Sequence, residues 1–349
     1  MTDRRNAFDL LRLLLASCVL VTHGILIGGY KLQDPLSFLS KGQTDLGEFG
    51  VMGFFALSGY LITSSFDRTK NIPEFLTHRF FRIFPGFWIC LLFTAFVIAP
   101  VIFCLNRPAA AFPITGQGSA LQFVRHNFFL KVDQWNIRDV LIYANYQGSL
   151  NGSLWSLYPE MQCYFFTMIA GFSGLFNKNK FLYLIVAVTI FTYFTVILNF
   201  SKNFGPTVLS LSPALKLYAS YVAGTLVYLF RDQLLFEKRS VVFLVLYGLI
   251  LVKFGGYHLF SPLLVALVLL NVFQLFEFKL KYDISYGIYI YSFPVQQLLS
   301  QIFHNKLNMV VFIFLSLLIS GVLGFFSYVF VERTFIKLRI KTDKLFKKT

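Results

Sequence analysis

The chain alternates long apolar runs with shorter polar segments along almost all of its 349 residues. Most runs are about 20 residues long, the length that an α-helix needs to cross the hydrocarbon core of a bilayer. Their apolar residues are continuous rather than alternating, which favours helices over a closed β-barrel. The pattern predicts about ten transmembrane helices, at residues 8–28, 46–65, 82–104, 148–170, 181–199, 213–230, 240–254, 259–276, 284–303 and 309–330.

Composition and charge agree with an all-α polytopic membrane protein. Hydrophobic residues make up 56% of the chain and charged residues only 13%, about half the usual charged fraction. With a cytoplasmic N-terminus, 20 of the 31 Lys and Arg residues lie on the cytoplasmic side and 9 on the other. This excess follows the positive-inside rule, so the net charge of +15 indicates cytoplasmic termini rather than a nucleic-acid partner.

The first predicted helix contains three ionisable residues, Asp9, Arg12 and His23. Arg12 and His23 are eleven residues apart, so in a helix they project from one face, about 16 Å apart along the axis. Asp9 lies one turn before Arg12 on the same side. Ionisable groups inside a spanning helix are expensive and face a protein interior or a polar cavity, which predicts a functional site. The alternative is that Arg12 and His23 extend to the two membrane interfaces.

The second predicted helix carries four glycines, Gly47, Gly50, Gly53 and Gly59. Glycines allow helices to approach closely, or allow a helix to unwind beside a cavity. Pro73 then begins a short piece that we expect to be amphipathic, before the third predicted helix. The four cysteines have no spacing typical of a metal site and are interpreted as small core residues.

Arg79 and Arg82 stand three residues apart where the third predicted helix leaves the cytoplasmic face. Their guanidinium groups share one helix face, and each can bind a phosphate through two hydrogen bonds. This arrangement favours a phosphorylated ligand. Ordinary cytoplasmic anchoring of the helix is the alternative.

The segment 105–147 is the longest predicted external connection, and its aromatic residues indicate an ordered piece rather than a disordered loop. The next run, from 149 to 166, places Trp155, Ser156 and Glu160 at the start of the fourth predicted helix. Ser156 and Glu160 are four residues apart and are expected to share a face. Glu160 can orient a base or accept a hydrogen bond from a hydroxyl group, or it can simply complement the helix dipole.

Taken together, these segments resemble the acyltransferase-three family of integral-membrane O-acyltransferases, from residue 8 to about residue 335. The resemblance rests on six segments in the same order: Arg12 and His23 separated by ten residues, GVMGFFALSGYLI, RFFRIFP, NGSLWSL followed by Glu160, ISYGIYIYSFP, and VERTF. One position departs from the pattern. Many relatives carry a histidine before the aromatic-proline pair of the ninth helix, where this chain has Ser292.

The resemblance implies a transmembrane acyltransferase domain at 1–332 and a basic cytoplasmic tail at 333–349. It implies transfer of an acyl group, most often acetyl, from cytoplasmic acetyl-CoA to a hydroxyl of a surface or exported glycan such as O-antigen, exopolysaccharide or capsule. The enzyme would be a multi-pass protein of the bacterial inner membrane, with no metal. The acceptor, the acyl chain length and the oligomeric state stay open.

The resemblance also implies a role for each candidate residue. His23 would take the acceptor proton, since an ordinary imidazole pKa suits that task near neutral pH, or would carry the acyl group covalently. The full expectation is catalysis by His23, Arg12 and Glu160, donor binding by Arg79, Arg82 and Arg12, and acceptor binding by Trp155, Ser156 and Asp9.

Two other classes of protein fit parts of the sequence. A transporter or flippase of a glycan or lipid-linked precursor would explain the glycines of the second helix and the intramembrane charges. It would not explain the Arg79 and Arg82 pair beside the membrane. A non-catalytic scaffold would leave the charged residues of the first helix without a role.

Overall fold

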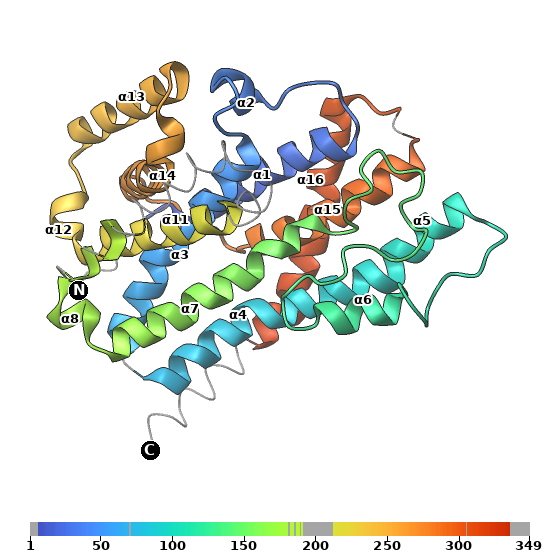
Figure 1. Ribbon diagram of the computed structural model, residues 1–349, viewed down its shortest axis with the longest axis horizontal. Helices are drawn as coiled ribbons and strands as arrows, with labels where there is room; N and C mark the ends of the chain where they lie inside the picture. The colour runs from blue at the N-terminus through green and yellow to red at the C-terminus, as the bar shows by residue number, and fades with distance from the viewer. Residues whose placement is uncertain are drawn as a thin grey trace. The chain divides into compact units, whose positions relative to one another are not determined.

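The computed structural model describes residues 6–69, 71–180, 182–184, 186–188, 190, 212–304 and 306–335 (Figure 1). Every regular element in these residues is helical, in agreement with an all-helical membrane protein. The chain divides into two compact units. Unit 1 comprises Met1–Leu15, Pro35–Phe75 and Pro159–Leu280, and unit 2 comprises Ala16–Asp34, Leu76–Tyr158 and Lys281–Thr349.

Three helices contribute to both units. Helix α1 (Phe8–Ile27) begins in unit 1 and ends in unit 2, as does α4 (Ile72–Phe93), whereas α7 (Leu157–Phe172) begins in unit 2 and lies mostly in unit 1. The other described helices of unit 1 are α2 (Pro35–Leu39), α3 (Leu46–Thr69), α8 (Leu175–Lys178), α11 (Ser212–Leu229), α12 (Arg231–Leu234), α13 (Lys238–Phe254) and α14 (Tyr257–Gln274).

The centre of unit 1 is a close contact between α3 and α11. A Cβ atom added at Gly59 would lie 2.0 Å from the carbonyl oxygen of Tyr221, and one added at Gly224 would lie 1.8 Å from that of Ala56. The buried hydroxyl of Thr225 donates to the Gly59 carbonyl oxygen at 3.3 Å. Small residues therefore let two membrane helices touch backbone to backbone. Helix α3 is continuous here, so Gly59 serves packing and does not unwind the helix.

An ion pair also joins α3 to α11. Lys216, predicted inside a membrane span, donates to Glu48, and the hydroxyl of Thr44 donates to the other oxygen of the same carboxylate at 3.0 Å. The Lys216 side chain is 10% exposed and that of Glu48 is 27% exposed. Since a lone charge inside a bilayer is costly, the pairing explains how the apolar helix α11 accommodates a lysine.

Unit 2 is organised around α15 (Ser285–Ile302), of which 15 of 18 residues are buried. Its polar residues bond to the backbone of neighbouring segments: Gln296 donates to the Leu20 carbonyl oxygen at 2.8 Å, and Gln297 donates to that of Ser149 at 2.8 Å. The other described elements that begin in unit 2 are η1 (Thr94–Ile98, π-helical), α5 (Ala99–Asn106), α6 (Ala120–Asn127), η2 (Gly152–Ser156, 3₁₀), α16 (Met309–Phe326) and η3 (Ser327–Glu332, π-helical).

The long connection at 105–147 is ordered, as predicted. Helix α6 lies within it, and Ser119 caps this helix by accepting a hydrogen bond from the backbone N–H of Gln122 at 3.3 Å. The buried side chain of Asn127 accepts from the N–H of Asp133 at 3.0 Å and donates to the carbonyl of Gln134 at 2.8 Å. One asparagine thereby fixes the turn that follows the helix.

Four continuous helices in the described residues are long and apolar enough to cross a membrane: Phe8–Ile27, Leu46–Thr69, Ile72–Asn106 and Met309–Phe335. They coincide with the first, second, third and tenth predicted spans. Shorter apolar helices lie at Ala214–Leu229 and Phe260–Gln274. The predicted span 181–199 falls mostly outside the described residues, as does most of the tail at 333–349. The total of ten spans and the side of the termini stay predictions.

Two predicted boundaries are wrong. The segment from Pro73 is not a separate amphipathic piece but the first turns of a helix that continues to Asn106, because a proline in the first turn does not interrupt the helix that follows it. The α-helix of the fourth span begins at Leu157 rather than at 148. It follows a 3₁₀ turn that is capped by the side chain of Asn151, which accepts from the N–H of Ser153.

We predict that a bulky residue at the α3–α11 contact destabilises the protein. Gly59→Leu and Gly224→Leu should each lower stability by about 1–3 kcal/mol or more, because the added atoms would overlap backbone. Gly321→Leu on α16 is the control, since a Cβ atom there meets nothing within 4 Å. Thermal unfolding in detergent measures the effect. Equal stability of the three variants would contradict the close contact.

Candidate active site

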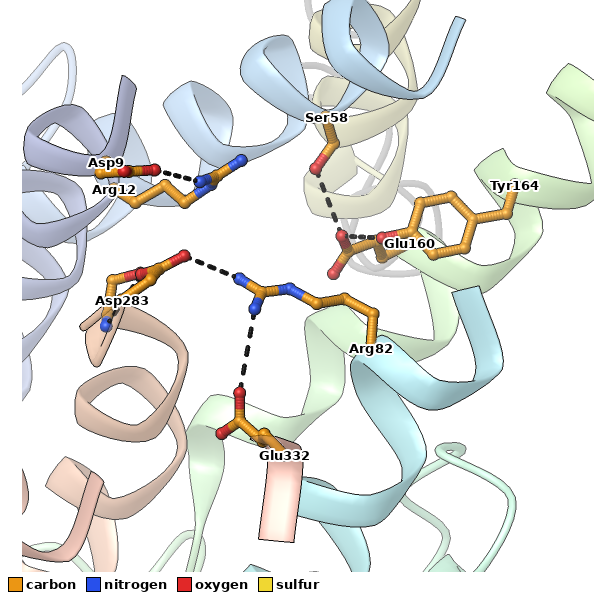
Figure 2. Close-up of polar contacts among 9 residues, drawn as sticks. Asp9, Arg12, Ser58, Arg82, Glu160, Tyr164, Asp283 and Glu332 are labelled. Atoms are coloured by element: carbon orange, nitrogen blue, oxygen red, sulfur yellow. Dashed lines mark hydrogen bonds and ion pairs between the residues drawn. The ribbon is translucent and has the colours of Figure 1, made fainter. Parts of the chain in front are cut away.

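Helix α1 brings Asp9 and Arg12 together in unit 1. The Arg12 guanidinium donates to Asp9 Oδ1 at 3.0 Å, and the side chains are 24% and 27% exposed (Figure 2). The helical spacing of three residues creates this pair, as the sequence indicates. Asp9, predicted to contact the acceptor, holds Arg12 in place.

His23 lies further along α1, in unit 2, beside a hydroxyl group and an aromatic ring. Oγ of Ser153 is 3.5 Å from Nδ1 of His23, and the Phe293 ring meets the imidazole edge-on with centroids 4.9 Å apart. The Ser153 N–H donates to Oδ1 of Asn151 at 3.3 Å. Asn151 in turn donates to the carbonyl of Ile290 on α15 at 2.9 Å, so the imidazole is flanked by groups that are themselves anchored.

Arg82 of α4 is held by two carboxylates in unit 2. Its guanidinium donates to Oδ2 of Asp283 at 3.1 Å and lies 3.8 Å from Oε2 of Glu332, the last residue of η3 (Figure 2). The Glu332 side chain is 3% exposed and that of Arg82 is 32% exposed. Arg79 lies one turn earlier on the same helix and is partly buried. Both arginines therefore lie on one helix, and acidic groups orient Arg82. Phosphate binding by this pair stays a prediction.

Glu160 accepts hydrogen bonds from two hydroxyl groups in unit 1. Ser58 of α3 donates to Oε1 of Glu160 at 3.2 Å, and the hydroxyl of Tyr164, one turn further along α7, donates to the same oxygen (Figure 2). Tyr164 is buried. A carboxylate at the first turn of a helix is favoured by the dipole, and this one is in addition bound across to another helix.

Ser156 and Glu160 do not lie on one α-helix. Ser156 ends the 3₁₀ turn η2, where its buried hydroxyl is 2.6 Å from that of Tyr289, whereas Glu160 lies in the first turn of α7. The shared face that a spacing of four residues predicts requires α-helical geometry at both positions, and Ser156 does not have it. Trp155 lies in the same 3₁₀ turn and is partly buried.

Sequence reasoning missed the partners of the candidate residues. Ser153 and Asn151 belong to the quoted segment NGSLWSL but carried no signal that linked them to His23. Asp283 directly precedes the ninth predicted helix and is 201 positions away from Arg82. A charged residue at the very end of an apolar run was the available indication for Asp283. Glu332 belongs to the quoted segment VERTF, but nothing in the sequence linked it to Arg82.

These groups support proton transfer and anion binding. The imidazole can exchange a proton, the carboxylate of Glu160 binds hydroxyl groups, and the arginines bind anions. Across the described part of the chain, no group of three or more His, Cys, Asp or Glu side chains is placed to hold a metal ion.

Comparison with known proteins agrees with this chemistry. Residues 5–329 match the family described as "Acyltransferase domain". A protein named O-acetyl transferase, from Shigella phage Sf6, is 28% identical over 350 residues, covering 95% of this chain and 96% of that protein. Nodulation protein 10 of Rhizobium leguminosarum bv. viciae is 35% identical over 88 residues, 25% of this chain and 23% of the relative. No solved structure matches significantly. The chain therefore belongs to the acyltransferase-three family and is a membrane O-acyltransferase.

Proposed function

We propose that the protein transfers an acetyl group from acetyl-CoA to a hydroxyl group of a surface or exported glycan, such as O-antigen, exopolysaccharide or capsule. The observation that carries the proposal is the imidazole of His23 beside the Ser153 hydroxyl, inside an apolar helix. The name of the phage relative, O-acetyl transferase, supports acetyl as the group transferred.

His23 is the general base in this proposal. If Nδ1–H donates to Ser153 Oγ, the other ring nitrogen, Nε2, carries a lone pair. Nε2 takes the proton of the acceptor hydroxyl while the oxygen of that hydroxyl attacks the thioester carbonyl carbon. The carbon–sulfur bond breaks, the CoA sulfur leaves as the thiolate and takes up a proton, and an acetyl ester remains on the acceptor. Transfer through an acetyl group carried on His23 is the alternative route.

Arg12 and Asp9 act as a pair in the proposal. The guanidinium of Arg12 lines the entry of the thioester arm of the donor, and the Asp9 carboxylate keeps it oriented through their 3.0 Å hydrogen bond. An oriented guanidinium needs no rearrangement when negative charge develops on the thioester oxygen. The joint action of Arg12 with His23 rests on their position in one helix.

Arg79 and Arg82 bind the CoA phosphates. A guanidinium has five N–H donors in a planar fork, a geometry that matches the oxygens of a phosphate. Asp283 accepts a hydrogen bond from the guanidinium of Arg82 and so orients it. Glu332 and Asp283 keep this fork from rotating. Glu160 binds the acceptor hydroxyl or orients it, with Trp155 stacking on a sugar ring and Ser156 placed beside it.

The topology belongs to the same proposal. Ten membrane-spanning helices with both termini in the cytoplasm form an acyltransferase domain at 1–332, followed by a basic tail at 333–349. The protein lies in the bacterial inner membrane, takes its donor from the cytoplasm and delivers the acetyl group to a glycan on the other side.

Replacing the base should abolish transfer. We expect His23→Ala to lower the rate by about 10²–10⁴-fold, the range for loss of a general base, and Arg12→Ala to be similarly inactive. Transfer of labelled acetyl from acetyl-CoA to cell-surface glycan, in membranes with equal amounts of each variant, measures this. His126→Ala, on the exposed surface of α6, is the control. Wild-type transfer by His23→Ala would overturn the assignment.

Replacing the arginines of α4 should weaken donor binding. The double variant Arg79→Ala, Arg82→Ala should raise KM for acetyl-CoA about ten-fold or more, the effect of losing a charged hydrogen bond. Arg125→Ala is the control, because it also removes a positive charge but lies on the exposed surface of α6, away from the pair. An unchanged KM in the double variant would mean that the CoA phosphates bind elsewhere.

Glu160→Gln should lower kcat about ten-fold and change KM for acetyl-CoA little. The substitution keeps the shape but replaces a charged acceptor by a weaker neutral one, at an oxygen that binds Ser58 and Tyr164. Tyr164→Phe, which removes one donor, should show a smaller decrease in the same direction. Tyr143→Phe at an exposed position is the control. A wild-type kcat in Glu160→Gln would mean that Glu160 has no catalytic role and only complements the helix dipole.

A further inference from the structure

Unit 1 contains an apolar cavity that the proposed reaction does not use. Its volume is about 530 Å³, within the range of sites that bind small organic molecules. Helices α2, α3, α13 and α14 all contribute side chains to its wall. Residues that represent the four helices are Leu36, Phe49, Gly248 and Leu264.

The cavity wall combines apolar side chains with the tyrosine ring of Tyr257 and one positive charge. Lys253, near the end of α13, lines the cavity, and no acidic residue does so among those that the structure describes. Glu48, one residue before the lining Phe49, is paired with Lys216. A ligand for this cavity therefore needs a long apolar part. The cationic group for an anionic part is the exposed ammonium of Lys253, which lies 5.6 Å from the centroid of the Phe254 ring.

The end of the cavity that carries Lys253 is held in place by a polar turn. The side chain of Gln43 donates to the backbone carbonyl oxygens of Leu251 and Val252, at 3.2 and 2.8 Å. This contact joins the turn before α3 to the last turn of α13.

The outer face of helix α13, a predicted membrane span, is exposed and apolar. Phe243 and Phe254 are 73% and 75% exposed, and Leu249 is 58% exposed while it also lines the cavity. In a membrane protein such a face contacts lipid chains rather than water. Because one side chain belongs both to this face and to the cavity wall, the cavity lies directly behind a lipid-contacting surface.

We propose that this cavity binds one hydrocarbon chain of an anionic phospholipid, with the lipid phosphate held by Lys253. Apolar walls match the chain, the cationic ammonium group matches the phosphate, and the exposed apolar face of α13 supplies the occupant from the bilayer. A water-soluble ligand would find too few hydrogen-bond partners in such walls. The inference goes beyond the acetyl transfer, since the lining residues include none of the residues assigned to it.

The test is lipid binding by the purified full-length protein. The protein in detergent is mixed with equal amounts of phosphatidylglycerol and phosphatidylcholine carrying identical chains, and retained lipids are counted by native mass spectrometry. We expect wild type to retain phosphatidylglycerol about five-fold over phosphatidylcholine, the factor for one lysine near a membrane surface. Lys253→Gln should bring this preference close to one, whereas Lys306→Gln, at an exposed turn of unit 2, should keep it.

Variants that fill the cavity distinguish binding of the hydrocarbon chain from binding of the headgroup. Gly248→Phe should remove both lipids, since a Cβ atom at Gly248 already touches Leu264 at 3.6 Å, and Gly321→Phe should retain them. Leu249→Trp fills the cavity from its exposed wall. It is the second filling variant, to be used if Gly248→Phe does not elute as a single folded species. An undiminished preference in Lys253→Gln, or undiminished retention in the folded filling variants, would overturn the proposal. Acetyl transfer is not the readout, so the result is independent of the proposed reaction.

Discussion

A polar group inside a bilayer has no water to bind, so each one must find its partner within the protein. This constraint explains the most specific contacts in both units. Lys216 of α11 is paired with Glu48, and Gln296 of α15 donates to a backbone carbonyl. Each contact joins segments far apart in the sequence. The same polar groups that must be satisfied therefore determine which helices pack together.

The constraint also separates groups that are fully occupied from groups that keep capacity for a substrate. Glu48 has both carboxylate oxygens engaged, by Lys216 and by Thr44. Among the described residues, one hydroxyl group contacts the imidazole of His23: Oγ of Ser153 lies 3.5 Å from Nδ1. An imidazole that is anchored on one side can react on the other. The distinction favours a structural role for the first group and a chemical role for the second.

Sequence reasoning located the four helices that are long and apolar enough to cross a membrane in the described residues, because apolar runs of about 20 residues are typical of helices in a bilayer. It also identified Arg12 and His23 as candidate residues, because ionisable residues within an apolar run can be recognised in the sequence alone. It failed where local geometry decides the outcome. Ser156 lies in a 3₁₀ turn, which the spacing to Glu160 does not reveal. It also failed for partners distant in sequence, such as Asp283, because periodicity within one helix carries no information about another.

Ser292 illustrates a different limit. The sequence marks it as a departure from a family pattern, and the structure places it fully buried on α15, immediately before the Phe293 ring that packs against His23. Its hydroxyl donates to the carbonyl of Tyr289 in the preceding turn at 3.4 Å. A fully buried position on a packed helix suits a small residue, and the hydroxyl of Ser292 finds its hydrogen-bond partner within the same helix. The chemical consequence of losing a histidine there depends on the substrate, which no local pattern describes.

The π-helical segment η3 sets the rotational phase of the last helix. A π-turn holds one more residue than an α-turn, so every residue after it is rotated about the axis relative to a regular continuation of α16. Glu332 ends this segment and is buried against Arg82. The direction of that carboxylate is thus encoded in the number of residues between Ser327 and Glu332 as much as in their identity. Single-residue insertions and deletions in this short segment are consequently a separate class of sequence change, one that redirects the carboxylate without altering its chemistry.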